Sequence, residues 1–226
     1  KAGNKGTGEI TNQSTKTLPG GSGSTTSGAI AFGGASWSNE KASITISTNT
    51  NYTIQYQINS TSGEWKNLTS GGSVTGLTHG NTVNARLTDG TNYGEVASTT
   101  IKDTTAPSSA NIEISPETAI AGQTISATVS HTDRESGVNI TASKWVFNTN
   151  ASNIGTADSS YTGTMSGSFI SNGQTIQITT NPANLGTYYL HVLTVDKAGN
   201  RQETISKAVV LNKITGNISY GAPTWA

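Results

Sequence analysis

The sequence predicts an all-β protein made of two tandem β-sandwiches joined by short linkers. Apolar and polar residues alternate with period two in many segments, which is typical of strands buried on one face. These segments recur at roughly ten-residue spacing, with glycine, asparagine and aspartate at the turns. Charged residues make up only 12% of the 226 residues, and 26 are glycine. This composition favours many short strands with hydroxyl-rich outer faces over a disordered chain.

The first sandwich is expected over residues 28–103. Alternation predicts seven short strands, at 29–32, 42–46, 52–58, 65–68, 74–77, 83–87 and 96–101. Trp37 precedes a turn at Asn39-Glu40, and Asp89-Gly90 is a hairpin signal. A boundary follows at 103–107, because Pro107 cannot continue a strand ladder.

The second sandwich is expected over residues 104–212. Strands are predicted around Ile112 and Ile114, at 125–129 and at 144–147, whereas 148–168 carry little pattern. Phe169-Ile170 and 176–178 predict a further hairpin.

The segment 188–195 carries the strongest strand pattern of this second sandwich. It is apolar on both sides, as in a strand well inside a sheet, and is followed by a turn at 196–200 and a predicted strand at 205–211. Tyr188 begins this strand, where it is either a tyrosine corner or an ordinary buried side chain.

Two short sequences recur at the ends of the chain. Lys-Ala-Gly-Asn at 1–4 returns at 197–200, and the Gly, Ile, Gly and Trp positions of 28–38 return in register at 216–226, 188 residues later. We therefore expect 1–27 to be a last-strand remnant of a preceding repeat plus a Gly/Ser linker. Residues 213–226 would be a linker and the first strand of the next repeat. A terminal strand donated to a neighbouring subunit is the alternative.

Charge and composition argue against several classes of function. With 13 basic and 13 acidic residues, the chain has no net positive charge that would attract nucleic acid or an anionic membrane. No apolar run approaches the roughly 20 residues of a membrane span. The three histidines, His79, His131 and His191, do not cluster in the sequence. We therefore expect no catalytic site, no cofactor-binding site and no enzyme activity.

Four carboxylate residues form the one metal-site candidate. Asp103, Asp133, Glu135 and Asp196 are expected to meet at one end of the second sandwich, at the domain junction, where they could hold Ca²⁺. The alternative is that Asp133 and Asp196 cap turns. Three nearby cations favour this alternative: Lys102, Arg134 and Lys197.

An isopeptide bond and an aromatic sugar-binding surface are two further possibilities that the sequence leaves open. An intramolecular Lys–Asn isopeptide bond would require a buried lysine, and Lys144 and Lys207 lie in predicted strands without a matching motif. Trp65 and Tyr93 would form either a sugar-binding platform or ordinary packing on a sheet edge.

The sequence resembles known repeat families along nearly its whole length. Residues 103–107, 133–138 and 186–200 resemble the tandem Ig-like repeats of bacterial surface proteins. Residues 28–103, with Tyr-Gln-Ile-Asn, Gly-Glu-Trp and Ala-Arg-Leu-Thr-Asp-Gly, resemble the Ig-like or fibronectin-III-like modules that alternate with them. Similar modules occur in phage tail and fibre proteins.

The resemblance implies a non-enzymatic structural repeat of a long extracellular bacterial protein, serving as a stalk, filament or surface-layer segment. An adhesin or phage-fibre module that recognises a glycan or a surface protein is the alternative. The implied partners are neighbouring repeats, other copies through self-association, and a glycan or host ligand. The absence of cysteine also fits an exported bacterial protein or a virion appendage.

Overall fold

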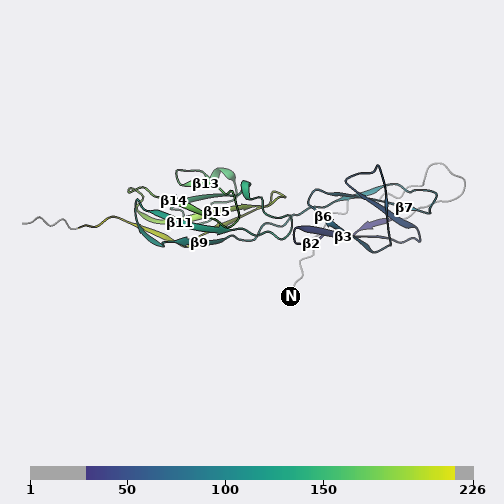
Figure 1. Cartoon of the computed structure of the whole chain (residues 1–226), viewed down its shortest axis with the longest axis horizontal. Helices are drawn as coiled ribbons and strands as arrows, with labels where there is room; N and C mark the ends of the chain where they lie inside the picture. The colour runs from purple at the N-terminus through teal and green to yellow at the C-terminus, as the bar shows by residue number, and fades with distance from the viewer. Residues whose placement is uncertain (1–28, 217–226) are drawn as a thin grey trace, which may run out of the picture. The chain divides into compact units, whose positions relative to one another are not determined.

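The computed structural model describes residues 29–216 (Figure 1). The predicted remnant and linker at 1–27, and the recurrence at 217–226, lie outside these residues. Contacts divide the described residues into two compact units, one of 29–105 with 133–137 and the other of 106–132 with 138–216. Both are built from strands, which confirms the predicted all-β fold.

The first sandwich holds eight strands in two sheets. In one sheet, β1 and β2 both pair with β3, which also pairs with β6; the other sheet has the order β5-β4-β7-β8. The strands are β1 (Ile30–Phe32), β2 (Ser36–Ser38), β3 (Lys41–Thr48), β4 (Thr53–Ile58), β5 (Lys66–Leu68), β6 (Gly72–Leu77), β7 (Thr82–Thr88) and β8 (Ala97–Thr100). Inward-facing residues from both sheets form one core, which includes Ile46, Ile54 and Leu77.

One detail of this sandwich differs from the prediction. Trp37 lies in a strand of its own, so there are eight strands rather than seven. The strands β1 and β2 pair with opposite ends of β3, like one strand that is interrupted near Gly33. A side chain at position 33 would overlap Thr45. The hairpin expected at Asp89-Gly90 is present, since β7 pairs antiparallel with β8, and the Asp89 carboxylate accepts the backbone N–H groups of Thr91 and Asn92 in its long connection.

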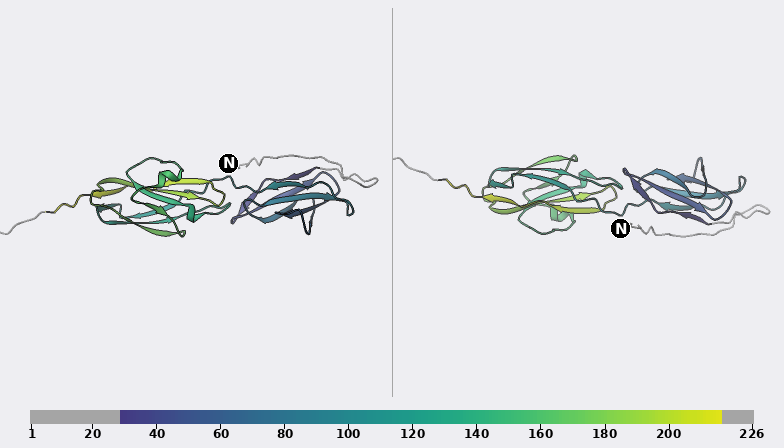
Figure 2. Two further views of the ribbon diagram at one scale, coloured as in Figure 1. Left: turned by 90° about the horizontal axis from the view of Figure 1, so that it is seen from above. Right: turned by 90° about the horizontal axis from the view of Figure 1, so that it is seen from below.

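The second sandwich holds nine strands in two sheets. Three form the sheet β14-β11-β9, and six form the sheet β10-β17-β15-β12-β13 with β16 beside β15. The strands are β9 (Asn111–Ser115), β10 (Thr118–Ile120), β11 (Thr124–Ser130), β12 (Lys144–Asn148), β13 (Ser166–Ser168), β14 (Gln174–Thr179), β15 (Gly186–Val195), β16 (Arg201–Ile205) and β17 (Val209–Asn212). Figure 2 shows the strands of each unit from two further sides.

Strand β15 is buried on both faces, as its sequence predicted. Leu190 and Val192 point into the core between the two sheets. Leu193 and Val195 belong to a second apolar cluster on the other face, which Tyr161 and the partly buried Ile154 complete. The segment 149–165, which carried little sequence pattern and contains the short 3₁₀ helix η2 (Asp158–Tyr161), therefore covers the outer face of this sheet.

The predicted strand at 205–211 is broken in the structure. Strand β16 pairs with the second half of β15, and β17 pairs with its beginning. Between them, Ser206 donates its backbone N–H to Leu190 and accepts the Leu190 N–H through Oγ, both at 2.9 Å. The serine side chain thus replaces a backbone acceptor and ends the first pairing.

The predicted hairpin of 169–170 with 176–178 is wrong. Strand β13 ends at Ser168 and pairs with β12, whereas β14 pairs with β11 in the other sheet. Phe169 is buried because its ring fills the core where the chain crosses between sheets, and Ile170 is exposed. Tyr188 is an ordinary buried side chain stacked on Phe147, with ring centroids 5.2 Å apart. Its hydroxyl makes no hydrogen bond within residues 29–216, so it is not a tyrosine corner.

Candidate functional sites

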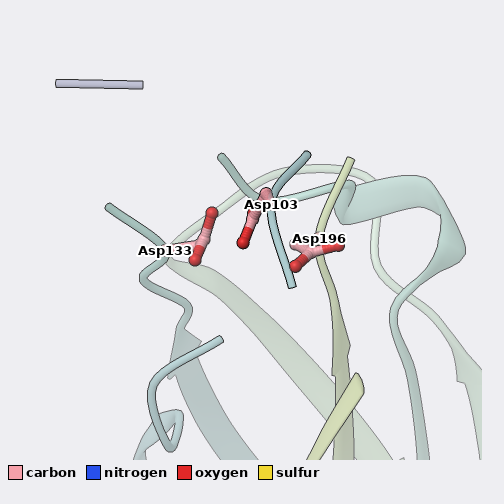
Figure 3. Close-up of side chains that lie close together, drawn as sticks. All are labelled: Asp103, Asp133 and Asp196. Carbon is pink, nitrogen blue, oxygen red and sulfur yellow. The ribbon is translucent and has the colours of Figure 1, made fainter. Parts of the chain in front are cut away.

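Three of the four predicted carboxylates come together (Figure 3). Asp103 comes from the segment after β8, Asp133 from the connection after β11, and Asp196 from the turn between β15 and β16. One carboxylate oxygen of each lies within 4.8 Å of the others. Asp103 and Asp196 are buried, and Asp133 is half-buried. Among residues 29–216 this is the one group of potential ligands with such spacing.

The same carboxylates cap the local backbone. Asp133 accepts the Gly137 N–H at 2.6 Å, and Asp196 accepts the Asn200 N–H at 2.7 Å. Asp103 accepts the N–H groups of Thr105 and Ser136 at 2.9 and 3.0 Å. These are the contacts expected of aspartates that fix turns, so the cluster fits the turn-capping alternative.

Glu135, the fourth predicted residue, interacts with the cluster through Asp103. Burial, a hydrogen bond with Asp103, and the charges of Asp103 and Asp133 raise the pKa of the Glu135 carboxyl. Burial also acts to raise the pKa of Asp103, but hydrogen bonds from Glu135, Ser136 and Thr105 outweigh it and hold that pKa below its usual value. When the two carboxyl groups share one proton, these opposite pKa shifts favour its place on Glu135 rather than on Asp103.

These residues offer carboxylate oxygens, the ligand type that Ca²⁺ prefers. However, Ca²⁺ takes about 6–8 oxygen ligands, and oxygens of all three aspartates already accept backbone N–H groups. Calcium binding at this cluster stays a prediction, and turn capping by the same aspartates is the alternative.

A chelator is expected to leave thermal unfolding unchanged. A cation present at 100 times its dissociation constant would stabilise the fold by about 2.7 kcal/mol, which is several degrees for a chain of this size. Melting the chain in excess EDTA and in excess calcium chloride, with magnesium chloride as the ionic control, measures this directly. A midpoint that rises in calcium alone would contradict this expectation, because it would show that the folded chain binds the ion.

The histidines lie apart and contact different partners. His79 accepts the Asp103 backbone N–H through Nδ1. His131 is buried, with Nδ1 2.8 Å from Thr194 Oγ1 and its ring edge-on to Phe169. Its Nε2 is buried without a hydrogen-bond partner, and burial lowers the pKa of His131 to about 4.

His191 and Glu203 form a buried polar network that the sequence did not reveal. His191 Nδ1 lies 2.8 Å from Glu203 Oε1, and Nε2 lies 2.9 Å from the Asn150 carbonyl oxygen. The Glu203 carboxylate also accepts the backbone N–H groups of Ile154 and Gly155 at 2.9–3.0 Å. Two strand residues thus hold the segment 149–165 against the sheet.

The two aromatic residues predicted as a platform or as packing lie beside one cation. The guanidinium carbon of Arg86 is 4.1 Å from the Trp65 ring centroid and 3.9 Å from that of Tyr93. This contact could not be predicted, because in the sequence Arg86 has the pattern of an ordinary outward-facing strand residue.

The two lysines considered for isopeptide bonds face carboxylates on the surface. Lys144 Nζ lies 3.2 Å from Asp158, which also pairs with Arg201 at 2.6 Å. Lys207 lies 3.3 Å from Glu117, and its side chain is 80% exposed. Neither lysine has the buried surroundings that such a bond requires.

Comparison with known proteins gives structural neighbours and no close relative. No protein family and no curated protein matches the chain. Fibronectin(III)-like modules of Clostridium thermocellum CbhA match at 10% identity and a TM-score of 0.34, over 85% of this chain and 100% of theirs. The Yersinia pseudotuberculosis adhesin InvE matches at 20% and 0.35, over 78% of this chain and 55% of its own.

Murine CEACAM1b matches at 13% identity and a TM-score of 0.39, over 82% of this chain and 100% of its own. The neighbours are thus fibronectin-III-like modules, a bacterial adhesin and Ig-like domains. Within residues 29–216 no helix is long and apolar enough to cross a membrane. The Ig- and fibronectin-III-like, all-β fold class rests on the strand pairing itself.

Proposed function

We propose that the chain is a non-enzymatic structural repeat of a long extracellular bacterial surface protein, serving as a stalk, filament or surface-layer segment. One observation carries this proposal, the paired recurrence within the sequence. The Gly, Ile, Gly and Trp pattern of 28–38 returns at 216–226, and Lys-Ala-Gly-Asn of 197–200 stands also at 1–4. The two sequences recur after 188 and 196 residues, and such recurrence at a long period is the sequence sign of an array.

The places of these segments in the fold support the array. Most of 28–38 forms β1 and β2, which open the first sandwich, and 197–200 forms the turn of the β15–β16 hairpin, which precedes the last strand of the second, β17. The recurring sequences thus belong to the first and the late strands of a two-sandwich unit. Each sandwich also has its own core, as modules that are stable one by one require.

Composition supports a place outside the cell. The chain has no cysteine, zero formal net charge and hydroxyl-rich outer strand faces, which suit an exported repeat that neither binds polyanions nor depends on disulfides. A bacterial surface protein and a phage virion appendage share these properties, and the array favours the bacterial protein as the first choice.

Antibodies against the chain are expected to label intact cells of the bacterium that produces it. Their Fab fragments, used on cells with and without permeabilisation, distinguish surface display from an internal location. A cytoplasmic protein of the same cells is the control for membrane integrity. Labelling that appears only after permeabilisation would contradict a surface role.

The second candidate is an adhesin or phage-fibre module that recognises a glycan or a surface protein. It is favoured by the contacts of the Arg86 guanidinium with the Trp65 and Tyr93 rings. Binding of the isolated chain to a glycan array would favour this role over a purely structural one.

A further inference from the structure

The outer face of the sheet β5-β4-β7-β8 carries a rigidly held arginine. Arg86 Nε donates to Gln55 Oε1 at 3.0 Å, and Gln55 Nε2 donates to Asn67 Oδ1 at 3.1 Å. The three residues sit side by side in the strand register, so the hydrogen bonds form a row across β7, β4 and β5. With Trp65 and Tyr93 against the guanidinium, the side chain is fixed by Nε and by its π contacts.

The Nη edge of this guanidinium is left available. Within residues 29–216, the Arg86 side chain makes one hydrogen bond, through Nε, and no ion pair, and it is half-buried. A guanidinium edge with two parallel N–H donors matches a carboxylate in a bidentate geometry. Because Arg86 is already immobilised, little conformational entropy remains to be lost when an anion binds.

The surroundings of this edge suit a sugar. Tyr93 is 45% exposed, so part of its flat ring can contact the C–H face of a pyranose. Asn67 is exposed, and its side chain makes one hydrogen bond in the described residues, through Oδ1, which leaves its Nδ2 for a ligand oxygen. The face therefore combines three groups: the two parallel Nη–H donors of Arg86, here called the fork, the exposed ring of Tyr93, and the amide of Asn67.

A polar pocket borders the same face. Gln57 lies two residues from Gln55 on the outer side of β4 and is only 7% exposed, yet its Oε1 has no hydrogen-bond partner. It lines a pocket of about 290 Å³, together with Tyr56, Ile58, Ser60, Ser62, Glu64 and Lys66. Glu64 and Lys66 balance in charge, so the pocket favours hydroxyl groups, one of which could donate to Gln57.

From these contacts we infer that the first sandwich binds a carboxylate-bearing saccharide, with the carboxylate on the Arg86 Nη groups and the sugar ring against Tyr93. Uronic and sialic acids share the required chemistry, a carboxylate on a polyhydroxylated ring. The inference does not depend on the array: a structural repeat can carry this surface, and the surface can act without it.

The test is an NMR titration of the whole chain with five probes. These are the methyl glycosides of galacturonic acid and N-acetylneuraminic acid, neutral methyl galactoside, acetate, and the peptide N-acetyl-Gly-Ala. At least one acidic glycoside is expected to bind with a dissociation constant near the millimolar range, shifting the Trp65 indole and the Gln55 and Asn67 amides. The neutral glycoside should not shift these signals. Comparing the galacturonic acid and N-acetylneuraminic acid glycosides shows whether the site prefers a uronate or a sialate.

Substitutions of Arg86 show whether binding needs the bidentate geometry of the guanidinium or only its positive charge. Arg86→Gln and Arg86→Lys are both expected to weaken the acidic glycoside about tenfold or more, because neither side chain has the fork. Arg201→Gln removes an exposed arginine of the second sandwich and should bind as the native chain does. Tyr93→Ala removes the surface for the sugar ring and one of the two π contacts of Arg86, so it should also weaken binding, and it tests the site even if the Arg86 variants fold poorly.

Three results would overturn the inference. One is that neither acidic glycoside shifts the three named side chains of the native chain. Another is that acetate or the peptide binds as tightly as the glycosides, which would make this a plain carboxylate site. The third is unchanged affinity in a folded Arg86→Gln chain.

Discussion

Glu203→Ala is expected to destabilise the second sandwich by about 3–5 kcal/mol, because it leaves several buried hydrogen-bond partners without their acceptor, at about 1–3 kcal/mol for each. The substitution leaves the Ile154 and Gly155 N–H groups and the His191 ring without the acceptor they share. It also releases the segment 149–165, whose Ile154 and Tyr161 cover Leu193 and Val195. The Glu203 side chain is 1% exposed, so water cannot replace these bonds without local opening.

Amide hydrogen exchange of β15 measures this loss, because its slowest amides report unfolding of the second sandwich alone. Glu117→Ala is the matched control, since Glu117 pairs with Lys207 on the surface and should contribute less than about 1 kcal/mol. Equal small effects in both variants would show that Glu203 does not hold 149–165 in place.

Acid is expected to destabilise the second sandwich through His131. Burial lowers the pKa of His131 from its ordinary 6.5 to about 4 in the folded state. Between these values the unfolded chain takes up a proton and the folded chain does not, so stability falls as the pH falls through this window. The shift corresponds to about 3 kcal/mol, fully present above pH 6.5 and lost by about pH 4.

The variant His131→Asn isolates this effect. The asparagine amide can reach the position of Nδ1, next to Thr194, but it does not titrate. Its unfolding free energy, followed by exchange in β15, should depend less on pH between about 6.5 and 4 than that of the native chain. The same pH slope in both chains would contradict the assignment, because carboxyl groups and the other histidines are common to the two.

Alternation predicted the strands whose burial is one-sided or complete. In β3 and β4, apolar residues at every second position mark the face that packs inward, and in β15 apolar residues on both faces mark a central strand. Asp103, Asp133 and Asp196, three of the four carboxylates of the predicted site, offer oxygens that lie within 4.8 Å of one another. Such patterns depend on local sequence and on the general geometry of the fold.

Features that depend on partners far apart in sequence were missed. The segment 149–165 has few apolar residues, and its attachment depends on Glu203, some 50 positions away in the chain. The break between β16 and β17 depends on a single hydroxyl group, that of Ser206, and on where Leu190 lies beside it. The guanidinium of Arg86 is held by the rings of Trp65 and Tyr93, which lie outside β7, and no periodicity in the sequence predicts these contacts.

The most direct test of the repeat-unit account is mechanical unfolding of a concatemer. Four copies of residues 28–215 joined head to tail would place 28–38 of each copy where 216–226 stand in this chain. Pulled as single molecules, they should unfold in two steps per copy, each lengthening the chain by roughly 3.3–3.6 Å per released residue. One step per copy, or extension without resistance, would contradict a chain of independently stable modules.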